Sequence, residues 1–307
     1  MSEFSPPYDF KAGAVLLVNK PLTWTSFDVV NKLRYTIKKH LDVKKIKVGH
    51  AGTLDPMATG ILVLGFNNGT RLLQYITDGD KSYQATVVLG AATVTDDVEG
   101  EVVSTADTSP ITDAQIHEEL SKMRGTIMQR PSSVSAVKID GERAYDRVRS
   151  GKEVVLPSRE VTISQLDVLA IRRLDKGIEI DIEVTCSSGT FIRAIARDCG
   201  DALGVGGHLN SLRRSRVAGF GLDRAFTLAQ LKNGEFSTLD LADVARATFP
   251  VREIGLEEKI ELSFGRTLTA NPDNQIYAGI SATNELIALL NNVDGKAKPI
   301  AVFAAAQ

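Results

Sequence analysis

An aspartate stands in a glycine-rich, apolar segment of this chain, Gly49-His50-Ala51-Gly52-Thr53-Leu54-Asp55-Pro56-Met57-Ala58-Thr59-Gly60. Asp55 has no second acid beside it in the sequence, and the apolar run over residues 60–65 is typical of a buried strand. A carboxylate held against a core is unfavourable unless it has a partner or a chemical task. Asp55 is therefore the leading candidate for a catalytic group.

Three further groups of residues could contribute to a site. They are Asn19-Lys20-Pro21 after a first strand, Asp80-Lys81-Ser82-Tyr83 at a strand entrance, and residues 186–193, which combine a strand, a tight turn and the start of a helix. Each group also has a plain structural interpretation. Asp55 could belong to a Pro-containing turn, Tyr83 could be a core aromatic, and Arg193 could be an exposed helix residue.

The sequence lacks the common motifs of other chemistries. The segment over residues 49–60 lacks the Gly-Lys-Ser/Thr ending of a phosphate loop, and no GxGxxG, HExxH or GxSxG motif is present. The histidines have no metal-ligand spacing. The sequence therefore predicts no cofactor, no metal and no serine nucleophile.

The hydrophobic pattern predicts the elements that must position these groups. Strands are expected over residues 15–18, 60–65 and 83–89, and two long strands between 161 and 185. A short helix is expected over 70–76. Thr25 should begin a helix that runs to about residue 39, with Phe27, Val30, Leu33 and Ile37 on its apolar face. Thr112 begins another helix, and a further helix should run from Thr190 to Gly204.

The turn at residues 139–142 should lead into a helix closed by Gly151. The segments that follow residue 243 suggest a second, smaller unit. Residues 244–251 resemble a linker, and strand-like runs follow at 260–262, 275–279, 286–290 and 300–303. With 307 residues, the chain is long enough for a large core and a small β module.

Composition and charge narrow the protein class. The chain is 43% apolar and 24% charged, with no run of membrane-spanning length and no apolar leader. Its two cysteines form no CxxC pair, so a reducing cytoplasm is expected. The net charge is −2, yet residues 32–47 hold seven Lys/Arg and one acid. Such a segment could attract phosphates or could simply be a solvated helix face.

Taken together, the motifs resemble the TruB family of pseudouridine synthases. The resemblance runs in family order from about residue 15 to residue 220. Its segments are Asn19-Lys20-Pro21 with Thr25-Ser26-Phe27-Asp28, the Asp55 segment, Lys81-Ser82-Tyr83, Ser135-Ala136-Val137-Lys138, Gly141-Glu142-Arg143-Ala144-Tyr145, Ser188-Gly189-Thr190-Phe191-Ile192-Arg193, and Gly207-His208-Leu209 to Leu212-Arg213-Arg214. The C-terminal run over residues 299–303 is similar to the small PUA-like β domain of the family.

The resemblance implies isomerisation of uridine 55 in the T-loop of tRNA to pseudouridine, without metal or cofactor. Uracil can depart as a stabilised anion, so one carboxylate suffices where a glycosidase normally needs a second, protonated acid. Asp55 would act as the nucleophile, or at least assist departure through an oxocarbenium-like state. Arg193 would keep Asp55 ionised and hold it in a forked geometry that lysine could not reproduce. Tyr83 would stack on the target base and take part in proton transfer.

The resemblance also implies residues that bind the RNA. The target nucleotide must be flipped out of its loop. His50 would fill the space that the base vacates, or could merely cap its turn. Lys20 would support the site or meet the RNA backbone, and Leu212 would wall the pocket. Lys81 and Arg143 belong to the same substrate-binding set, and the basic stretches over 32–47 and 143–149 would follow phosphates.

Two departures from the family pattern stand out. The family commonly has glycine where Thr23 stands, which allows a different turn in the loop near Lys20. It often has Pro-x-Tyr where this chain has Ser132-Ser133-Val134, so a pocket aromatic is expected to be missing. Neither departure touches Asp55, Tyr83 or Arg193.

The sequence therefore predicts an α+β fold in two parts. Residues 1–245 would form the pseudouridine synthase catalytic domain, on a mixed, mainly antiparallel sheet with a central cleft, and residues 250–307 a small PUA-like β domain. The partner would be the T-arm of tRNA, with no membrane, no obligate protein partner and a monomeric state. The alternatives are a guide-RNA-dependent relative working in a ribonucleoprotein, which typically has a fuller PUA domain and often lysine-rich extensions, and a non-catalytic RNA-binding or RNA-folding module.

Overall fold

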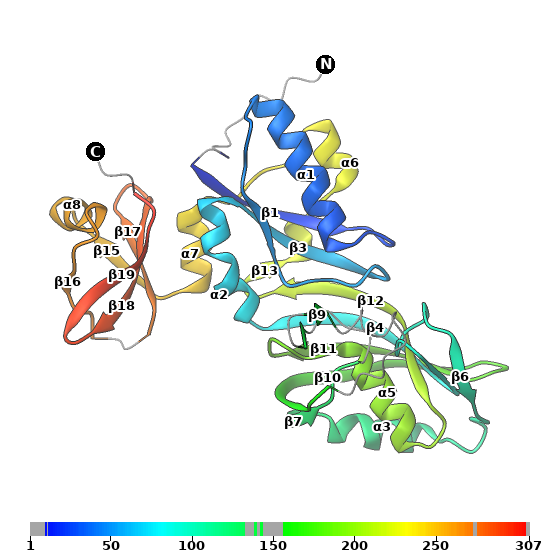
Figure 1. Ribbon diagram of the computed structural model, residues 1–307. Coiled ribbons are helices and arrows are strands. Elements are labelled where there is room, and N and C mark those ends of the chain that lie inside the picture. The colour runs from blue at the N-terminus through cyan, green and yellow to red at the C-terminus, as the bar shows by residue number, and fades with distance from the viewer. Residues whose placement is uncertain are drawn as a thin grey trace.

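The largest feature is a ten-stranded sheet (Figure 1), seen in a computed structural model that describes residues 10, 12–132, 138–139, 142–143, 156–272 and 275–304. Its strands are β1 (Gly13–Lys20), β2 (Val48–Ala51), β3 (Ala58–Asn67), β4 (Lys81–Leu89), β7 (Gly125–Gln129), β10 (Arg159–Arg173), β11 (Ile178–Cys186), β12 (Gly207–Val217), β13 (Phe220–Gly221) and β14 (Phe226–Thr227). The main path runs β14-β1-β3-β12-β4-β11-β10-β7. Only the β1–β14 and β3–β12 pairs are parallel. The predicted mixed, mainly antiparallel sheet is confirmed.

Helices cover this sheet in separate layers. They are α1 (Ser26–Leu41), α2 (Leu73–Asp78), α3 (Asp113–Lys122), α5 (Ile192–Ala202), α6 (Leu228–Asn233) and α7 (Leu241–Thr248), with the 3-10 helices η1 (Asn68–Arg71) and η2 (Leu222–Arg224). The helix α8 (Leu256–Ser263) packs instead on the second sheet, which is described below. The helix α1 packs on one face of β1 and β3, while α2 and α7 pack on the opposite face. At the other end, α3 and α5 cover β4, β11 and β12. None of the described helices is long and apolar enough to cross a membrane.

The helix α1 begins as its sequence predicts. The Thr25 side chain accepts from the backbone N–H of Asp28, and the Asp28 carboxylate accepts from the N–H of Thr25, which forms a capping box. The predicted apolar face is correct for Val30, Leu33 and Ile37, which are buried. It is wrong for Phe27, which is 63% exposed. Val29 lies on the buried face instead.

The strand β4 and the helix α5 supply two of the predicted site residues. Alternate residues of β4 are buried, as the sequence pattern predicts, so Lys81 and Tyr83 share one face of the sheet. The helix α5 begins two residues later than expected. The Thr190 hydroxyl donates to the carbonyl of Ser187 at 3.0 Å, and Phe191 is the N-cap. Thr190 therefore stabilises the turn before the helix rather than capping it.

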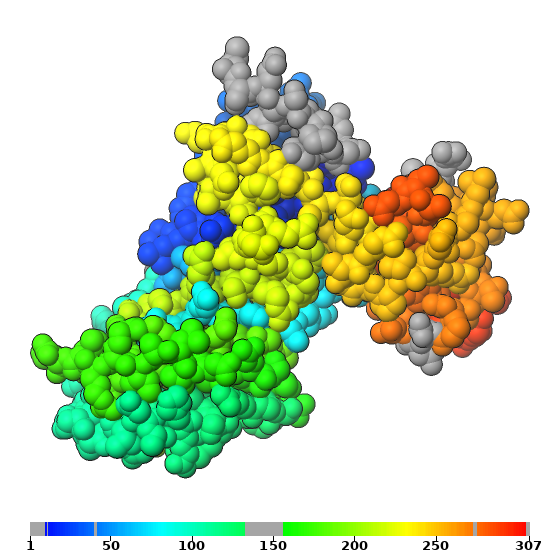
Figure 2. Space-filling view, turned by 180° about the vertical axis from the view of Figure 1, so that it is seen from behind, coloured from blue at the N-terminus to red at the C-terminus, as the bar shows by residue number. Residues whose placement is uncertain are grey.

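A second, five-stranded sheet forms the C-terminal part, in the order β15-β17-β18-β19-β16. Its strands are β15 (Val251–Ile254), β16 (Leu268–Thr269), β17 (Tyr277–Ser281), β18 (Leu286–Val293) and β19 (Lys296–Val302). Two separate two-stranded sheets pair β5 (Ala91–Thr93) with β6 (Val102–Thr105), and β8 (Lys138–Ile139) with β9 (Glu142–Arg143). Figure 2 shows the molecule from behind, with the yellow-orange segment that includes α7 between the body and the C-terminal sheet. Buried residues of α2 and α7 form one apolar cluster with β17 and β18.

Two predictions about this C-terminal part are wrong, and one prediction about an earlier segment cannot be compared. Most of the expected linker over residues 244–251 belongs to α7, because Val244 and Ala245 are fully buried. The expected strand over residues 260–262 lies inside α8, which buries Leu262. The helix expected to end at Gly151 lies outside the described residues.

Candidate active site

Asp55 lies in the loop between β2 and β3, and this loop is fixed at several points. The Leu54 N–H donates to the hydroxyl of Ser26, the first residue of α1, at 2.9 Å. The Ala58 N–H donates to the carbonyl of Asp55 at 3.1 Å. The Asp55 carboxylate remains 36% exposed. The backbone is thus anchored to the core while the carboxylate is open to a ligand.

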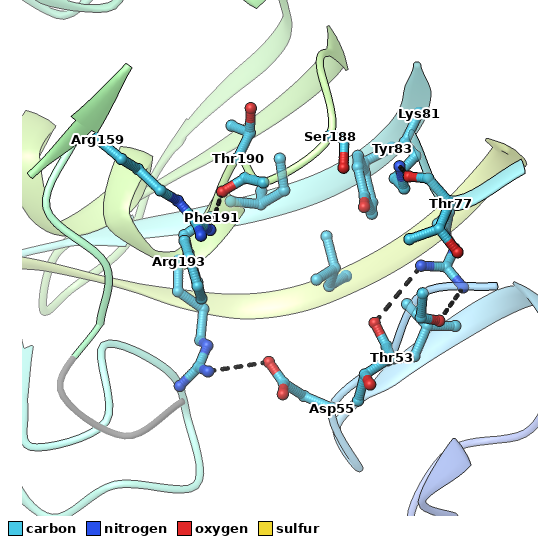
Figure 3. A pocket seen from close by; sticks show the side chains of 16 residues that line it. Thr53, Asp55, Thr77, Lys81, Tyr83, Arg159, Ser188, Thr190, Phe191 and Arg193 are labelled. Atoms are coloured by element: carbon cyan, nitrogen blue, oxygen red, sulfur yellow. Dashed lines mark hydrogen bonds and ion pairs between the residues drawn. The ribbon is translucent and has the colours of Figure 1, made fainter. Parts of the chain in front are cut away.

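Arg193 joins Asp55 to a second carboxylate (Figure 3). One terminal nitrogen, Nη2, lies 3.1 Å from Oδ2 of Asp55, and the other, Nη1, lies 3.2 Å from Oδ2 of Asp97. Nη1 also donates to the carbonyl of Thr95 at 2.8 Å. The side chains of Arg193 and Asp97 are only 6% and 4% exposed. A buried guanidinium between two carboxylates is fixed in orientation and balanced in charge.

Asp97 was not identified from the sequence. Its Oδ1 accepts from the Thr95 hydroxyl at 2.5 Å and from the Glu99 N–H at 3.1 Å, so its own turn holds it in place. Burial raises the pKa of Glu99, and the negative charges of Asp97 and Asp55 raise it further. No local pattern distinguishes Asp97, because acids in a polar turn are common and only the fold brings this turn beside α5.

Arg214 holds the other side of the Asp55 loop. Its side chain is fully buried on β12 and donates to the backbone carbonyls of Ile61 at 3.0 Å, Gly52 at 3.0 Å and Thr53 at 3.5 Å. The strands approach closely here, since a Cβ added to Gly60, at φ 106°, would lie 2.2 Å from the Arg214 carbonyl oxygen. Sequence reasoning placed Arg214 in a motif but assigned it no role.

Tyr83 pairs in register with Arg214 across β4 and β12. Burial raises the pKa of the Tyr83 phenol, while the positive charge and hydrogen bond of Arg214 act in the opposite direction. Burial also lowers the pKa of Arg214. At neutral pH the phenol therefore keeps its proton and presents a flat, neutral ring to the pocket.

The two predicted lysines are both buried and bound to carbonyls. The Lys20 ammonium donates to Pro21 at 3.0 Å, Trp24 at 2.5 Å and Pro56 at 3.3 Å. Burial lowers its pKa to about 8, and Asp55 partly opposes that shift. The Lys81 ammonium donates to Thr77 at 2.6 Å and Gly79 at 2.7 Å, and burial lowers its pKa too.

A pocket of about 310 Å³ collects most of these groups. Asp55, Lys81, Tyr83, Arg193 and Leu212 from the predicted site line it, and Arg159 and Arg214 are added to them. Lys20 and His50 lie outside its described lining. His50 is half-buried on β2, where burial and the charge of Arg214 lower its pKa. The side chain of Arg143 lies outside the described residues.

This arrangement limits the chemistry. Among the described residues, no group of three or more His, Cys, Asp or Glu side chains could hold a metal ion. What converges instead is an accessible carboxylate beside a guanidinium, a neutral phenol and an apolar wall. Such a site suits a ligand with a flat ring. The carbon atom next to that ring could be attacked by the carboxylate, or could develop positive charge that the carboxylate stabilises.

Comparison with known proteins gives consistent matches along the chain. Residues 38–192 match the TruB family pseudouridylate synthase N-terminal domain, 193–246 the tRNA pseudouridylate synthase B C-terminal domain, and 249–304 the tRNA pseudouridine synthase II C-terminal domain. The tRNA pseudouridine synthase B of Arthrobacter sp. (strain FB24) is 49% identical over 301 residues, covering 94% of this chain and 96% of that protein. That of Corynebacterium diphtheriae is 48% identical, covering 90% and 91%.

The fold also matches solved structures at low sequence identity. A chain of a Cbf5–Nop10–Gar1 complex superposes with a TM-score of 0.72 at 23% identity, covering 97% of this chain and 86% of that chain. A chain of an H/ACA ribonucleoprotein bound to a substrate RNA containing 2′-deoxyuridine gives the same TM-score at 21% identity, with coverage of 98% and 88%. These likenesses concern the fold.

Proposed function

Because the chain belongs to the TruB family of pseudouridine synthases, we propose that it converts uridine 55 in the T-loop of tRNA to pseudouridine. The tRNA substrate is that of its curated relatives, which match along almost their whole length. The position of the uridine follows from the family resemblance of the motifs around Asp55, Tyr83 and Arg193. We propose further that the enzyme acts alone, without a guide RNA.

The reaction is an isomerisation in which atoms and electrons balance within one nucleotide. The bond between C1′ and N1 breaks, and uracil leaves as an anion. The base turns, C5 forms a new bond to C1′, C5 loses its proton and N1 gains one. Nothing is oxidised or consumed. The step that needs most help is the departure of uracil, because positive charge develops at the sugar.

The observation that carries the proposal is the pairing of Asp55 with Arg193 at a pocket. An ionised carboxylate can attack C1′ or stabilise the developing cation. The 3.1 Å contact with Arg193 places a positive charge beside the carboxylate and fixes its direction. Asp97 keeps the guanidinium in place from its other side. The Asp55 side chain is exposed enough to meet a nucleotide, whereas its partners are buried.

The other pocket residues receive roles that fit their placement. The neutral ring of Tyr83 stacks on the target base, and Leu212 forms the apolar wall beside it. The Lys20 and Lys81 ammonium groups support the backbone around the site, and the stem of Lys81 lines the pocket. We assign Tyr83 no base role at neutral pH, since its pKa is raised.

Residues outside the pocket would bind the rest of the RNA. Lys32, Lys39, Lys44, Lys45 and Lys47 are exposed, and in the described part of the chain no acid lies within ion-pair distance of them. Unneutralised cations of this kind suit a phosphate backbone. His50 is proposed to stack in the space left by the flipped nucleotide, and Arg143 to bind phosphates.

We propose the same two domains that the sequence predicts. Residues 1–245 would provide catalysis and residues 250–307 a small β domain beside it. The shared apolar cluster of α2, α7, β17 and β18 supports a fixed arrangement of the two. A cytoplasmic monomer without an obligate protein partner completes the proposal.

One experiment tests the function directly. The purified protein alone is incubated with an unmodified T-arm stem-loop, and new pseudouridine is mapped by chemical labelling. We expect product at the target uridine, and none with cytidine in its place. Asp55→Ala should abolish product and still bind RNA, whereas Asp201→Ala, which removes an exposed acid on α5, should behave as wild type. Product formed by Asp55→Ala would contradict the assignment.

A further inference from the structure

Five cationic side chains surround the candidate site, and four of them have their donors engaged by the protein. Lys20 and Lys81 donate to carbonyls, Arg193 to Asp55, Asp97 and the Thr95 carbonyl, and Arg214 to three carbonyls. These groups build the site and have little capacity left for an anionic ligand. The fifth cation, Arg159, differs.

Arg159 is the first residue of β10, and it lines the pocket. Its Cζ atom lies 4.5 Å from the centre of the Phe191 ring, and its Nη2 donates to the carbonyl of Gly189. Its Nε is buried and has no hydrogen-bond partner. No acid in the described part of the chain lies within ion-pair distance of it.

This geometry holds the guanidinium in one pose without neutralising it. A cation over an aromatic face is attracted by the ring, but the ring carries no opposite charge. Gly189 has φ 90°, a conformation that favours glycine and turns its carbonyl toward Arg159. Burial lowers the pKa of Arg159, yet an arginine stays protonated in proteins. A fixed, uncompensated cation in a pocket calls for an anion from the ligand.

A nucleotide in this pocket would bring that anion. Its ribose must place C1′ near Asp55, and a phosphodiester leaves the ribose on each side. Arg159 lines the same pocket as Asp55 and Arg193 (Figure 3), so a phosphate beside that ribose is expected to come near its guanidinium. We propose that Arg159 binds a phosphate group next to the target uridine when that nucleotide is flipped into the pocket. This inference rests on the proposed function and adds one specific contact to it.

The planar fork of arginine suits this task. Its donors match two phosphate oxygens at once, which gives orientation as well as charge. The contact would fix the sugar relative to Asp55, so its loss should affect both binding and the rate of the bound complex. If Arg159 only packed against Phe191, its loss could still affect binding or rate. That effect would not depend on whether the RNA carries a charged phosphate beside the target.

The test removes the charge from each partner in turn. T-arm stem-loops are made with one methylphosphonate, either 5′ or 3′ of the target uridine, and binding is measured in the Asp55→Ala background. Arg159→Gln should weaken binding of the normal RNA about 10- to 100-fold. One methylphosphonate should weaken binding of the parent protein by a similar factor, and the two changes together should add little more. Arg159→Gln should also reduce the slope of log affinity against log salt concentration by about one.

Two variants serve as controls. Arg266→Gln removes an arginine that also lies over a phenylalanine ring, that of Phe264, but in the segment between α8 and β16, and should leave binding unchanged. Arg159→Lys keeps the charge and the aliphatic stem, so it should bind normal RNA with an affinity between those of the parent and Arg159→Gln. If Arg159→Gln does not fold, Arg159→Lys replaces it in the same binding measurements with normal and methylphosphonate RNA.

The outcomes separate this inference from the proposed function. If Arg159 substitutions weaken normal and methylphosphonate RNAs by equal factors at both positions, Arg159 does not bind a phosphate next to the target. That result would leave the reaction itself intact. If wild-type protein makes no pseudouridine in the unmodified stem-loop, the proposed function fails, whatever the binding cycle shows.

Discussion

The Asp55 loop is held by two regions that use different chemistry. On one side, Arg193 contacts the Asp55 carboxylate itself and is balanced by Asp97. On the other side, Arg214 and Lys20 reach no carboxylate in the described contacts and bind carbonyls of the loop and its neighbours. Both regions bury a cation, but only the first brings opposite charges together.

The difference separates two requirements of the site. The ionic region sets the direction of the Asp55 carboxylate, which we propose to be the reactive group. The carbonyl-bound region sets where the backbone of the loop lies. Changes in the first should therefore reduce the rate with little loss of stability, and changes in the second should affect stability and rate together. The predictions below test that separation.

The largest effect is expected for Arg193→Lys. Lysine keeps the positive charge, so the buried Asp97 retains a partner and the protein should fold. It cannot span both carboxylates as the guanidinium does, and turnover should fall about 100- to 1,000-fold. Single-turnover rates and thermal unfolding are measured on the same samples. A near wild-type rate would remove the basis for the ionic region.

Asp97→Asn should have a smaller effect of the same kind. The amide is close to isosteric, but Arg193 loses a charged partner and its orientation is less fixed. We expect roughly a 10-fold loss in single-turnover rate, since hydrogen bonds to charged groups are the stronger class. RNA binding should be unchanged, because Asp97 is buried. Weaker RNA binding with a normal rate would contradict the positioning role.

Arg214→Lys tests the other region. One ammonium cannot reach carbonyls on both sides of the loop, so buried acceptors lose donors. We expect a loss of about 1–2 kcal/mol in the free energy of unfolding and a several-fold lower rate. Arg213→Lys, an exposed neighbour on the same strand, is the matched control. If Arg214→Lys reduced only the rate, with full stability, the proposed separation between the regions would be wrong.

Lys20 makes the same region sensitive to pH. Its pKa is lowered from 10.5 to about 8 by burial, so above about 8 the ammonium loses a proton and one of its three carbonyl contacts. The rate should fall a few-fold as the pH rises through that value. Stability should not fall for this reason. Between about 8 and 10.5 the unfolded lysine binds more protons than the folded one, which raises the free energy of unfolding.

The measurement compares single-turnover rate and thermal unfolding from neutral pH to above the lowered pKa. Arginine keeps its proton throughout, so the rate of Lys20→Arg should not fall over this pH range. A decline that accompanies unfolding, or one that is the same in Lys20→Arg, would show that Lys20 is not its cause.

The parts that the sequence predicts well are those that depend on local physics. Capping boxes at Thr25 and Thr112 begin helices as expected, and the alternation along β4 gives the buried face that carries Tyr83. Short apolar runs are ambiguous. The prediction of a strand at residues 260–262 is wrong because three apolar-patterned residues cannot distinguish a strand from one turn of a helix.

The parts that escaped prediction depend on contacts between distant segments. Asp97, Arg159 and Arg214 are ordinary residues in their local sequence, and their importance comes from the pocket that the fold builds around them. Motif resemblance predicts Asp55 and Arg193 as site residues because their surrounding residues are distinctive. It could not show which cations the protein itself engages and which one faces the pocket without an acid.

The smallest effect concerns a departure from the family pattern, in the carbonyl-bound region. Thr23 has φ 68°, a left-handed conformation that a β-branched residue adopts only with strain, and its N–H donates to the Pro56 carbonyl at 2.9 Å. Thr23→Gly should relieve the strain and keep that hydrogen bond, raising the free energy of unfolding by about 0.5–1 kcal/mol. Thr269→Gly, at an exposed strand position, should lower it instead. Denaturant titrations of both variants decide the matter. A Thr23→Gly variant less stable than wild type would mean that the threonine side chain stabilises the loop by more than its backbone strain destabilises it.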